Sequence, residues 1–188
     1  MSVSTEASGR TFAGNSPNMG KRVWVHNSAV ILGDLTLGDD VSIWPQVSIR
    51  ADVNSVRVGA RTNIQDGCVL HVSHKSEESP QGWPLDIGED VTIGHSAVVH
   101  GCTVSDRVLI GMGAIVMDGV VVETEVVIAA GALVTPGKVL RSHYLYAGSP
   151  AREVRPLKDS EIAHFRDSAA HYKELKDRYL ADSGQQTA

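Results

Sequence analysis

The sequence predicts an all-β fold: a parallel β-helix of six-residue repeats, with one α-helix at the C-terminal end. Two patterns predict it. An aliphatic residue returns every six positions through most of the chain, and after residue 158 the spacing of apolar residues changes to three and four. A period of six fits neither a helical turn nor an alternating strand. It fits a short strand and a corner, so three repeats close one triangular coil and the coils stack.

The six-residue repeat is carried by seventeen aliphatic side chains, which we expect to form one continuous core. The repeat shifts only three times: between residues 49 and 58, between residues 70 and 87, and between residues 99 and 104. The second shift predicts a protruding loop. The seventeen side chains are Val25, Ile31, Leu37, Ile43, Ile49, Val58, Ile64, Leu70, Ile87, Ile93, Val99, Val104, Ile110, Val116, Val122, Ile128 and Val134.

The chain divides into four segments, consistent with one domain and an extension for 188 residues at 20.1 kDa. Residues 1–20 are polar and rich in Gly and Ser, which predicts a flexible N-terminal arm. Residues 21–135 form the β-helix domain, and residues 136–157 form a connector. Residues 158–183 form the C-terminal helix.

The C-terminal helix is predicted by one apolar stripe. Six apolar residues are spaced 3, 4, 3, 3 and 4 apart, as on one face of a helix. Asp159 or Ser160 can cap its start. We expect this helix to lie along one face of the β-helix. The stripe consists of Ile162, Phe165, Ala169, Tyr172, Leu175 and Tyr179.

The composition argues against several classes of partner. The net charge is −5 and the pI about 5.9, which disfavours nucleic-acid binding. No apolar run approaches the roughly 20 residues of a membrane span, and the first residues lack the apolar core of a secretion signal. The two cysteines, Cys68 and Cys102, have no metal-ligand spacing. We therefore expect a cytoplasmic protein without a nucleic-acid or membrane partner.

Three of the eight histidines fall on neighbouring predicted coils. On one face, the residues that directly follow the core positions form a column of Arg50, His71 and His100. Neighbours in such a column lie about 4.8 Å apart, so His71 and His100 can bind one metal ion together. On the preceding face Asp66 and His95 stack in the same way. His95 can therefore join the other two only across a subunit interface, as in a homotrimer.

Three imidazoles leave one coordination position open, which is the pattern of a catalytic rather than a structural zinc site. A divalent cation lowers the pKa of bound water and so generates hydroxide near neutral pH. Imidazole also suits iron and cobalt, so Zn²⁺ is the default metal and Fe²⁺ or Co²⁺ are alternatives.

Three sequence runs carry a resemblance to a known family. They are Arg50-Ala-Asp52-Val-Asn54, Asn63-Ile-Gln65-Asp66-Gly-Cys-Val-Leu-His71 and Gly94-His95-Ser-Ala-Val-Val-His100-Gly101-Cys. They resemble the γ-class carbonic anhydrases, and Tyr144-Leu-Tyr146-Ala-Gly148-Ser-Pro150 resembles the small bacterial members. The resemblance implies a homotrimeric, left-handed β-helix of hexapeptide repeats, with a metal ion shared between subunits.

The resemblance also implies roles for single residues. His71, His95 and His100 would be the metal ligands. Arg50, Asp52 and Asp66 would form a charged network at the interface, Gln65 would position the metal-bound hydroxide or the substrate, and Tyr146 is a further candidate catalytic residue. The implied reaction is the reversible hydration of carbon dioxide to bicarbonate by a metal-bound hydroxide.

The sequence departs from the most active members of that family at the residues that export the proton. Where those members have glutamates, this chain has Val53 and, roughly, His74. Histidine titrates near pH 6.5, so His74 is a candidate proton shuttle. Glu77 and Glu78 in the same loop are further candidates. Weak hydratase activity follows if none of them serves.

Three other functions compete with carbon dioxide hydration. A hexapeptide-repeat acyltransferase would use coenzyme A, and Gly148-Ser-Pro-Ala-Arg152 resembles a short motif near the end of such enzymes. Such an enzyme needs one catalytic histidine and not three on adjacent coils. A metal-dependent thioesterase would use the same metal site. A non-catalytic subunit of a larger complex would keep the trimer.

Overall fold

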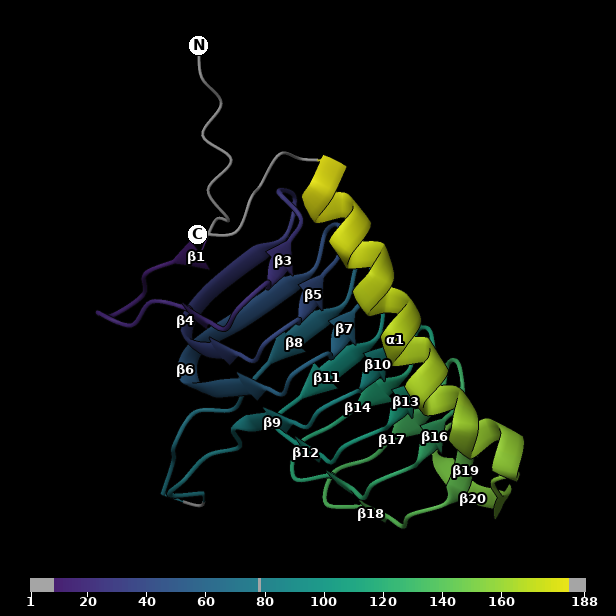
Figure 1. The fold of residues 1–188 in the computed structure, drawn as a ribbon. Coiled ribbons are helices and arrows are strands. Elements are labelled where there is room, and N and C mark those ends of the chain that lie inside the picture. Colours follow the sequence, from purple (N-terminus) through teal and green to yellow (C-terminus); the bar gives the residue numbers. More distant parts are fainter. Residues whose placement is uncertain (1–8, 78, 183–188) are drawn as a thin grey trace.

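The computed structural model is a parallel β-helix with three faces, along one of which a single α-helix runs (Figure 1). The structure describes residues 9–77 and 79–182. The predicted fold is confirmed: short parallel strands stack coil upon coil, and the C-terminal helix α1 (Asp159–Asp182) packs against the strands of one face. Among the described residues, no helix is long and apolar enough to cross a membrane.

The face that carries α1 is a sheet of eight strands, all parallel except for an antiparallel pair at its end. Each strand is one step of successive coils, and most have two residues because the six-residue repeat leaves room for little more before the next corner. In spatial order the strands are β3 (Trp24–Val25), β5 (Ser42–Ile43), β7 (Asn63–Ile64), β10 (Thr92–Ile93), β13 (Leu109–Ile110), β16 (Val127–Ile128), β19 (Tyr144–Gly148) and β20 (Ala151–Pro156).

The other two faces share two long strands, β4 (Val30–Leu37) and β6 (Ser48–Val58), which continue from one face to the next. We call the face with the histidines the His face; beyond β6 it contains β8 (Val69–His71), β11 (Val98–His100), β14 (Ile115–Val116) and β17 (Leu133–Val134). The third face contains β9 (Leu85–Ile87), β12 (Thr103–Val104), β15 (Val121–Val122) and β18 (Val139–Leu140). The predicted loop leaves the stack between β8 and β9 (Figure 1).

All seventeen aliphatic residues of the repeat are buried, which confirms the predicted core. They stack in three columns, one per face; on the His face Ile49 pairs with Leu70, Leu70 with Val99, and Val99 with Val116. Burying one aliphatic side chain of this size contributes about 1.5–3 kcal/mol, so each step of these columns stabilises the fold.

The stack extends beyond both predicted boundaries of the β-helix. Leu140 and Tyr146 continue the six-residue repeat after Val134 and are buried, so residues 136–157 hold β18, β19 and β20 where we predicted a connector. The predicted repeat ended at Val134 although Leu140 lies on the same spacing, and Tyr146 was missed as a core position because it is aromatic. At the other end, β1 (Gly9–Arg10) and β2 (Asn18–Met19) pair with β4, inside the segment predicted as a flexible arm. Residues 1–8 of that arm lie outside the described part.

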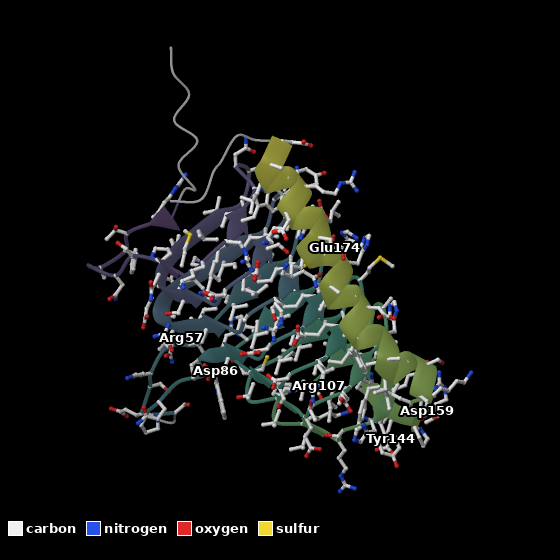
Figure 2. The ribbon with its side chains drawn as sticks, in the orientation of Figure 1. Arg57, Asp86, Arg107, Tyr144, Asp159 and Glu174 are labelled. Atoms are coloured by element: carbon white, nitrogen blue, oxygen red, sulfur yellow. The ribbon has the colours of Figure 1, made fainter. Side chains whose placement is uncertain are left out.

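One corner of the β-helix carries a row of charged residues with positive φ. Residues other than glycine are uncommon in this conformation. The signs alternate from coil to coil, and neighbours form ion pairs: Arg61 with Asp90 at 2.7 Å, and Arg107 with Glu125 at 2.9 Å. Arg107 is labelled in Figure 2. The row consists of Arg22, Asp40, Arg61, Asp90, Arg107, Glu125 and His143.

The packing of α1 depends on one buried charge. Phe165 and Ala169 of the predicted stripe are buried, but the most deeply buried side chain of α1 is Lys176, with 0% exposed. Its Nζ donates to Asp40 Oδ1 at 2.8 Å, to Asp177 Oδ1 at 2.6 Å and to the Arg22 carbonyl at 3.1 Å. This side chain ties α1 to the charged corner row.

The start of α1 is fixed by Glu161 and not by the predicted caps. The Glu161 carboxylate accepts from the backbone N–H of Lys158 at 2.8 Å, while the Lys158 carbonyl accepts from Ile162. This is half of a capping box, with Asp159 and Ser160 already inside the helix. Arg155 also binds Glu161, and its hydrogen bonds lower the pKa of Glu161 to about 2. Asp159 and Tyr144 lie at this same end of the molecule (Figure 2).

Candidate metal centre

The structure brings His71 and His100 together on the His face. Each is the last residue of its strand, β8 or β11, and the two are register partners. His71 Nδ1 lies 3.0 Å from His100 Nε2, and the ring centroids are 5.0 Å apart. Because the coils stack in register, two residues at equivalent positions 29 apart in sequence become neighbours. The predicted column is confirmed for this pair.

The outer nitrogen of each ring contacts an aspartate. His71 Nε2 lies 3.1 Å from Asp52 Oδ1, and His100 Nδ1 lies 2.5 Å from Asp118 Oδ1. Arg50 Nη1 donates to the other Asp52 oxygen at 2.6 Å. Burial acts to raise the pKa of Asp52, but hydrogen bonds from His71 and Arg50 outweigh it and lower the pKa. Asp52 is therefore an ionised acceptor for His71.

The hydrogen-bond chain from Asp118 to Asp52 needs one proton more than two neutral histidines carry. The chain has three contacts: Asp118 with His100, His100 with His71, and His71 with Asp52. Two neutral imidazoles supply two protons. Burial lowers the pKa of His71, which disfavours the additional proton. If Asp118 accepts from His100 Nδ1–H and Asp52 accepts from His71 Nε2–H, the other two nitrogens carry no proton. The lone pairs of His71 Nδ1 and His100 Nε2 then face each other.

Two lone pairs that face each other fit a divalent cation. Tetrahedral zinc at 2.0–2.1 Å from each nitrogen would hold the two nitrogens about 3.3 Å apart, close to the 3.0 Å between His71 Nδ1 and His100 Nε2. A carboxylate behind each ligand histidine is also the usual arrangement at metal sites. The chemistry of these donors therefore fits a metal ion better than a bridging proton.

His95 lies elsewhere in the same chain. It follows β10 at the corner between the α1 face and the His face, and its side chain is 46% exposed. Its Nδ1 lies 2.9 Å from Asp66 Oδ2, which confirms the predicted stacking of these two residues and leaves Nε2 free to bind a ligand. Across residues 9–77 and 79–182, no three His, Cys, Asp or Glu side chains of one chain form a group that could hold a metal ion.

The predicted charged network is only partly assembled within one chain. Arg50 and Asp52 form an ion pair beside His71. Asp66 pairs with His95 instead. His71, His95 and His100 thus each have an aspartate partner, and the sequence predicted an aspartate directly beside His95 alone.

Gln65 is buried under α1 and held in place by a chain of polar groups. Its Nε2 donates to Asn63 Oδ1 at 3.1 Å, and Asn63 Nδ2 donates to Thr92 Oγ1 at 2.9 Å. Thr92 Oγ1 in turn lies 3.0 Å from Ser168 Oγ of α1. Gln65 also lines a cavity of about 460 Å³ between the sheet and α1. The amide group is thus fixed at the edge of a space that a small molecule can enter.

Two candidate catalytic residues are not brought to the histidine pair. His74 is exposed in the loop after β8, and among the described residues its side chain has no hydrogen-bond partner. Tyr146 occupies a core position; its hydroxyl accepts from the Arg141 N–H at 2.8 Å and donates to Glu153 at 3.3 Å. Tyr146 lies three strands beyond β10, roughly 14 Å along the stack. Of the loop glutamates, Glu77 is exposed and Glu78 lies outside the described residues.

Sequence reasoning missed Asp118 and Ser73. Asp118 Oδ1 contacts His100, and Asp118 Oδ2 accepts from Ser73 Oγ at 2.6 Å. One signal for Asp118 exists in the sequence, because it follows His100 by 18 residues, the length of one coil. No comparable signal marks Ser73, which is 45 residues away from Asp118.

Comparison with known proteins places the chain in a family. It is 58% identical over 171 residues to protein YrdA of Escherichia coli, covering 91% of this chain and 92% of that protein. It is 48% identical over 157 residues to "Probable carbonic anhydrase" of Methanocaldococcus jannaschii, covering 84% of this chain and 94% of that one. It is 46% identical over 168 residues to the mitochondrial gamma carbonic anhydrase 1 of Arabidopsis thaliana, covering 89% of this chain and 61% of the plant protein.

The chain belongs to the γ-carbonic-anhydrase-like family of hexapeptide-repeat proteins. A crystal structure of a hexapeptide transferase family protein from Anaplasma phagocytophilum superposes with a TM-score of 0.83 at 39% identity, covering 90% of this chain and 96% of that one. No family model matches the sequence. Membership of the γ-carbonic-anhydrase-like family supports a carbonic-anhydrase-like function with a metal cofactor, and the fold is shared with transferases.

Proposed function

We propose that the protein is a cytoplasmic, metal-dependent carbonic anhydrase that hydrates carbon dioxide reversibly at the subunit interfaces of a homotrimer. The observation that carries the proposal is the pair His71–His100, whose inner nitrogens face each other at 3.0 Å while an aspartate contacts each outer nitrogen. Relatives named as carbonic anhydrases support the choice of reaction.

The homotrimer is supported by the position of the third ligand. His95 Nε2 has no partner in the described part of its own chain, and His95 lies at a corner where it can reach a neighbouring molecule. The His face also exposes three large apolar side chains on the strands of the histidine pair and the next coil, Val69, Ile115 and Met117. Exposed apolar patches of this kind mark protein–protein contacts.

The metal is Zn²⁺ by default, with Fe²⁺ or Co²⁺ as alternatives, because three imidazoles suit all of them. His71, His95 and His100 would hold it. When bound, such a cation lowers the pKa of a coordinated water to near neutrality, which is the chemistry that carbon dioxide hydration needs.

The surrounding residues have separate tasks. Asp52, Asp66 and Asp118 hold the outer N–H of the three ligands, so each ring presents its other nitrogen. Arg50 binds Asp52 and, across the subunit interface, would complete the charged network with Asp66. Gln65 uses only one amide hydrogen in its hydrogen bond to Asn63. The other amide hydrogen and the side-chain carbonyl oxygen would orient an oxygen of the substrate. His74, exposed in the loop three residues after His71, would pass the proton to solvent.

The test combines metal analysis with a hydration assay on the untagged protein. We expect about one divalent cation per chain and a carbon dioxide hydration rate that is lost in His71→Ala and His95→Ala. His171→Ala, an exposed histidine of α1, is the matched control and should keep both properties. Stoichiometric metal without hydration in any metal form would refute carbonic anhydrase activity.

A second candidate function is acyl transfer from coenzyme A, which the fold similarity to a hexapeptide transferase family protein favours. The cavity beside Gln65 and α1 would be its site. Titration with coenzyme A separates the two functions: saturable binding that survives His71→Ala would favour acyl transfer. A thioester substrate hydrolysed only by the metal-loaded protein would instead indicate a thioesterase at the same metal site. A metal-free trimer inactive in every assay would point to a non-catalytic subunit.

A further inference from the structure

Asp118 is bound from two sides by elements that are distant in sequence. Its Oδ1 lies 2.5 Å from His100 Nδ1, at the end of β11. Its Oδ2 accepts from Ser73 Oγ at 2.6 Å, at the base of the loop that leaves the stack after β8. The carboxylate is about one-third exposed and lies between a candidate metal ligand and a surface loop.

The base of this loop is itself well fixed. Ser73 and Trp83 exchange two backbone hydrogen bonds, at 3.0 and 3.2 Å, which closes the loop like a hairpin. The Asn54 side chain on β6 donates to the Ser73 carbonyl at 3.1 Å and to the Gln81 carbonyl at 2.9 Å. The Ser73 hydroxyl is therefore held where Asp118 needs a donor.

Two glycines leave room for Asp118 and for the loop. Gly101 has φ +47°, and a Cβ atom there would overlap Asp118 Oδ1 and lie 2.7 Å from Trp83 Cβ. At Gly119, with φ +67°, a Cβ atom would come within 3.0 Å of the Trp83 ring. The carboxylate thus packs on bare backbone directly after the His100 strand, with Trp83 beside it.

We propose that Asp118 is a positioning residue of the metal centre and that Ser73 holds it in place. By accepting from His100 Nδ1, Asp118 keeps the proton on that nitrogen, so the Nε2 lone pair points at His71 and at a divalent cation between them. Ser73, at the base of the loop, thereby helps to fix His100 through Asp118. This inference rests on the proposed metal site, but it concerns a tautomer that can be measured in the metal-free protein.

The first test measures the tautomer of His100 in the metal-free protein. NMR of ¹⁵N-labelled histidine side chains reports which ring nitrogen carries the proton. We expect His100 to carry its proton on Nδ1 in the native protein. In Asp118→Asn the anion is lost, and a second population with the proton on Nε2 should appear. Asp86→Asn, an exposed carboxylate on β9, is the matched control and should leave His100 unchanged.

The second test is the affinity for Zn²⁺, measured by competition with a chromophoric chelator. Losing a hydrogen-bond partner behind a metal ligand lowers affinity about 10–100-fold, which we expect for Asp118→Asn. Ser73→Ala leaves Asp118 in place, so we expect a smaller loss in the same direction. An unchanged tautomer in a folded Asp118→Asn would overturn the proposal. If that variant does not fold, native affinity and tautomer in Ser73→Ala would overturn it.

These readouts separate the inference from the proposed function. A tautomer shift in Asp118→Asn supports the positioning role even if the native protein proves inactive towards carbon dioxide. Conversely, full hydratase activity in the native protein with no tautomer shift in the variant would leave the function standing and refute the role of Asp118.

Discussion

The replacement Lys176→Met tests how α1 is attached to the β-helix. Methionine keeps most of the side-chain volume and removes the three hydrogen bonds from Nζ to Asp40, Asp177 and the Arg22 carbonyl. Removing one partner of a buried ion pair costs about 3–5 kcal/mol when the other charge is left uncompensated. Asp40 keeps its ion pair with Arg22, and Asp177 is 42% exposed, so the cost falls below that range.

We therefore expect Lys176→Met to lower the free energy of unfolding by about 1.5–3 kcal/mol, the range for hydrogen bonds to a charged group. Trp24 and Trp44 report on the attachment of α1, because their rings lie 5.0 Å from Tyr179 and 5.6 Å from Tyr172. Denaturant unfolding followed by tryptophan fluorescence is the assay. It must be run at one protein concentration, since dissociation of an oligomer would contribute.

Lys173→Met is the matched control for this experiment. Lys173 makes one ion pair, with Asp177 at 3.2 Å, and its side chain is 34% exposed. Exposed pairs of this type contribute about 0.5 kcal/mol or less. If the two replacements changed the free energy of unfolding equally, or if Lys176→Met were as stable as the native protein, the buried lysine would not be what attaches α1.

Three further predictions concern pH, packing and the charged corner. Hydrogen bonds from Arg22 and Lys176 lower the pKa of Asp40 despite its burial; its contribution is therefore present above the unfolded pKa of about 3.9 and lost as pH falls through the lower folded value. In acid unfolding, Asp40→Asn should lose less free energy of unfolding over that pH range than the native protein does. The same pH dependence in both proteins would contradict this. Gly101→Ala should displace Asp118 and Trp83 and weaken Zn²⁺ binding about tenfold or more, measured by chelator competition, whereas native affinity would show that the space is not needed. The double variant Arg61→Asp/Asp90→Arg exchanges the two charges and should recover part of the stability that either single change loses. Thermal unfolding of all three variants measures this. Additive effects of the two single changes would refute coupling along the corner.

The core of this fold could be predicted from the sequence because each coil repeats one requirement. Every sixth side chain must fill the same axial space, so the pattern survives insertions at the corners, as at the loop between Leu70 and Ile87. The prediction ended too early: it left out Leu140, which keeps the six-residue spacing, and it did not expect a core position filled by Tyr146, whose hydroxyl is satisfied by Arg141 and Glu153. Lys176 was missed for a related reason: its buried charge depends on Asp40, 136 residues away.

The candidate site was predictable where it follows the repeat. His71 and His100 occupy equivalent positions on adjacent coils, so the repeat alone predicted their contact. Asp118 depends on the corner, where the offset between paired strands changes from 17 residues at Val99 and Val116 to 18 at Thr103 and Val121. A count of 18 residues from His100 marks Asp118 as a candidate, but the change of offset leaves the direction of its side chain open. The structure was needed to show that Asp118 turns towards His100.

A subunit-mixing experiment tests the central claim, a metal site shared between subunits, most directly. His71→Ala and His95→Ala should each bind no metal alone, because every site lacks one ligand. When the two proteins are unfolded together and reassembled, a site is complete wherever a His95→Ala chain supplies the pair and a His71→Ala neighbour supplies His95, about one quarter of sites in a random trimer. The account predicts metal at roughly that level in mixed trimers of about 60 kDa (three chains of 20.1 kDa). A mixture that stays metal-free, or a His95→Ala protein that keeps its full complement of metal, would contradict it.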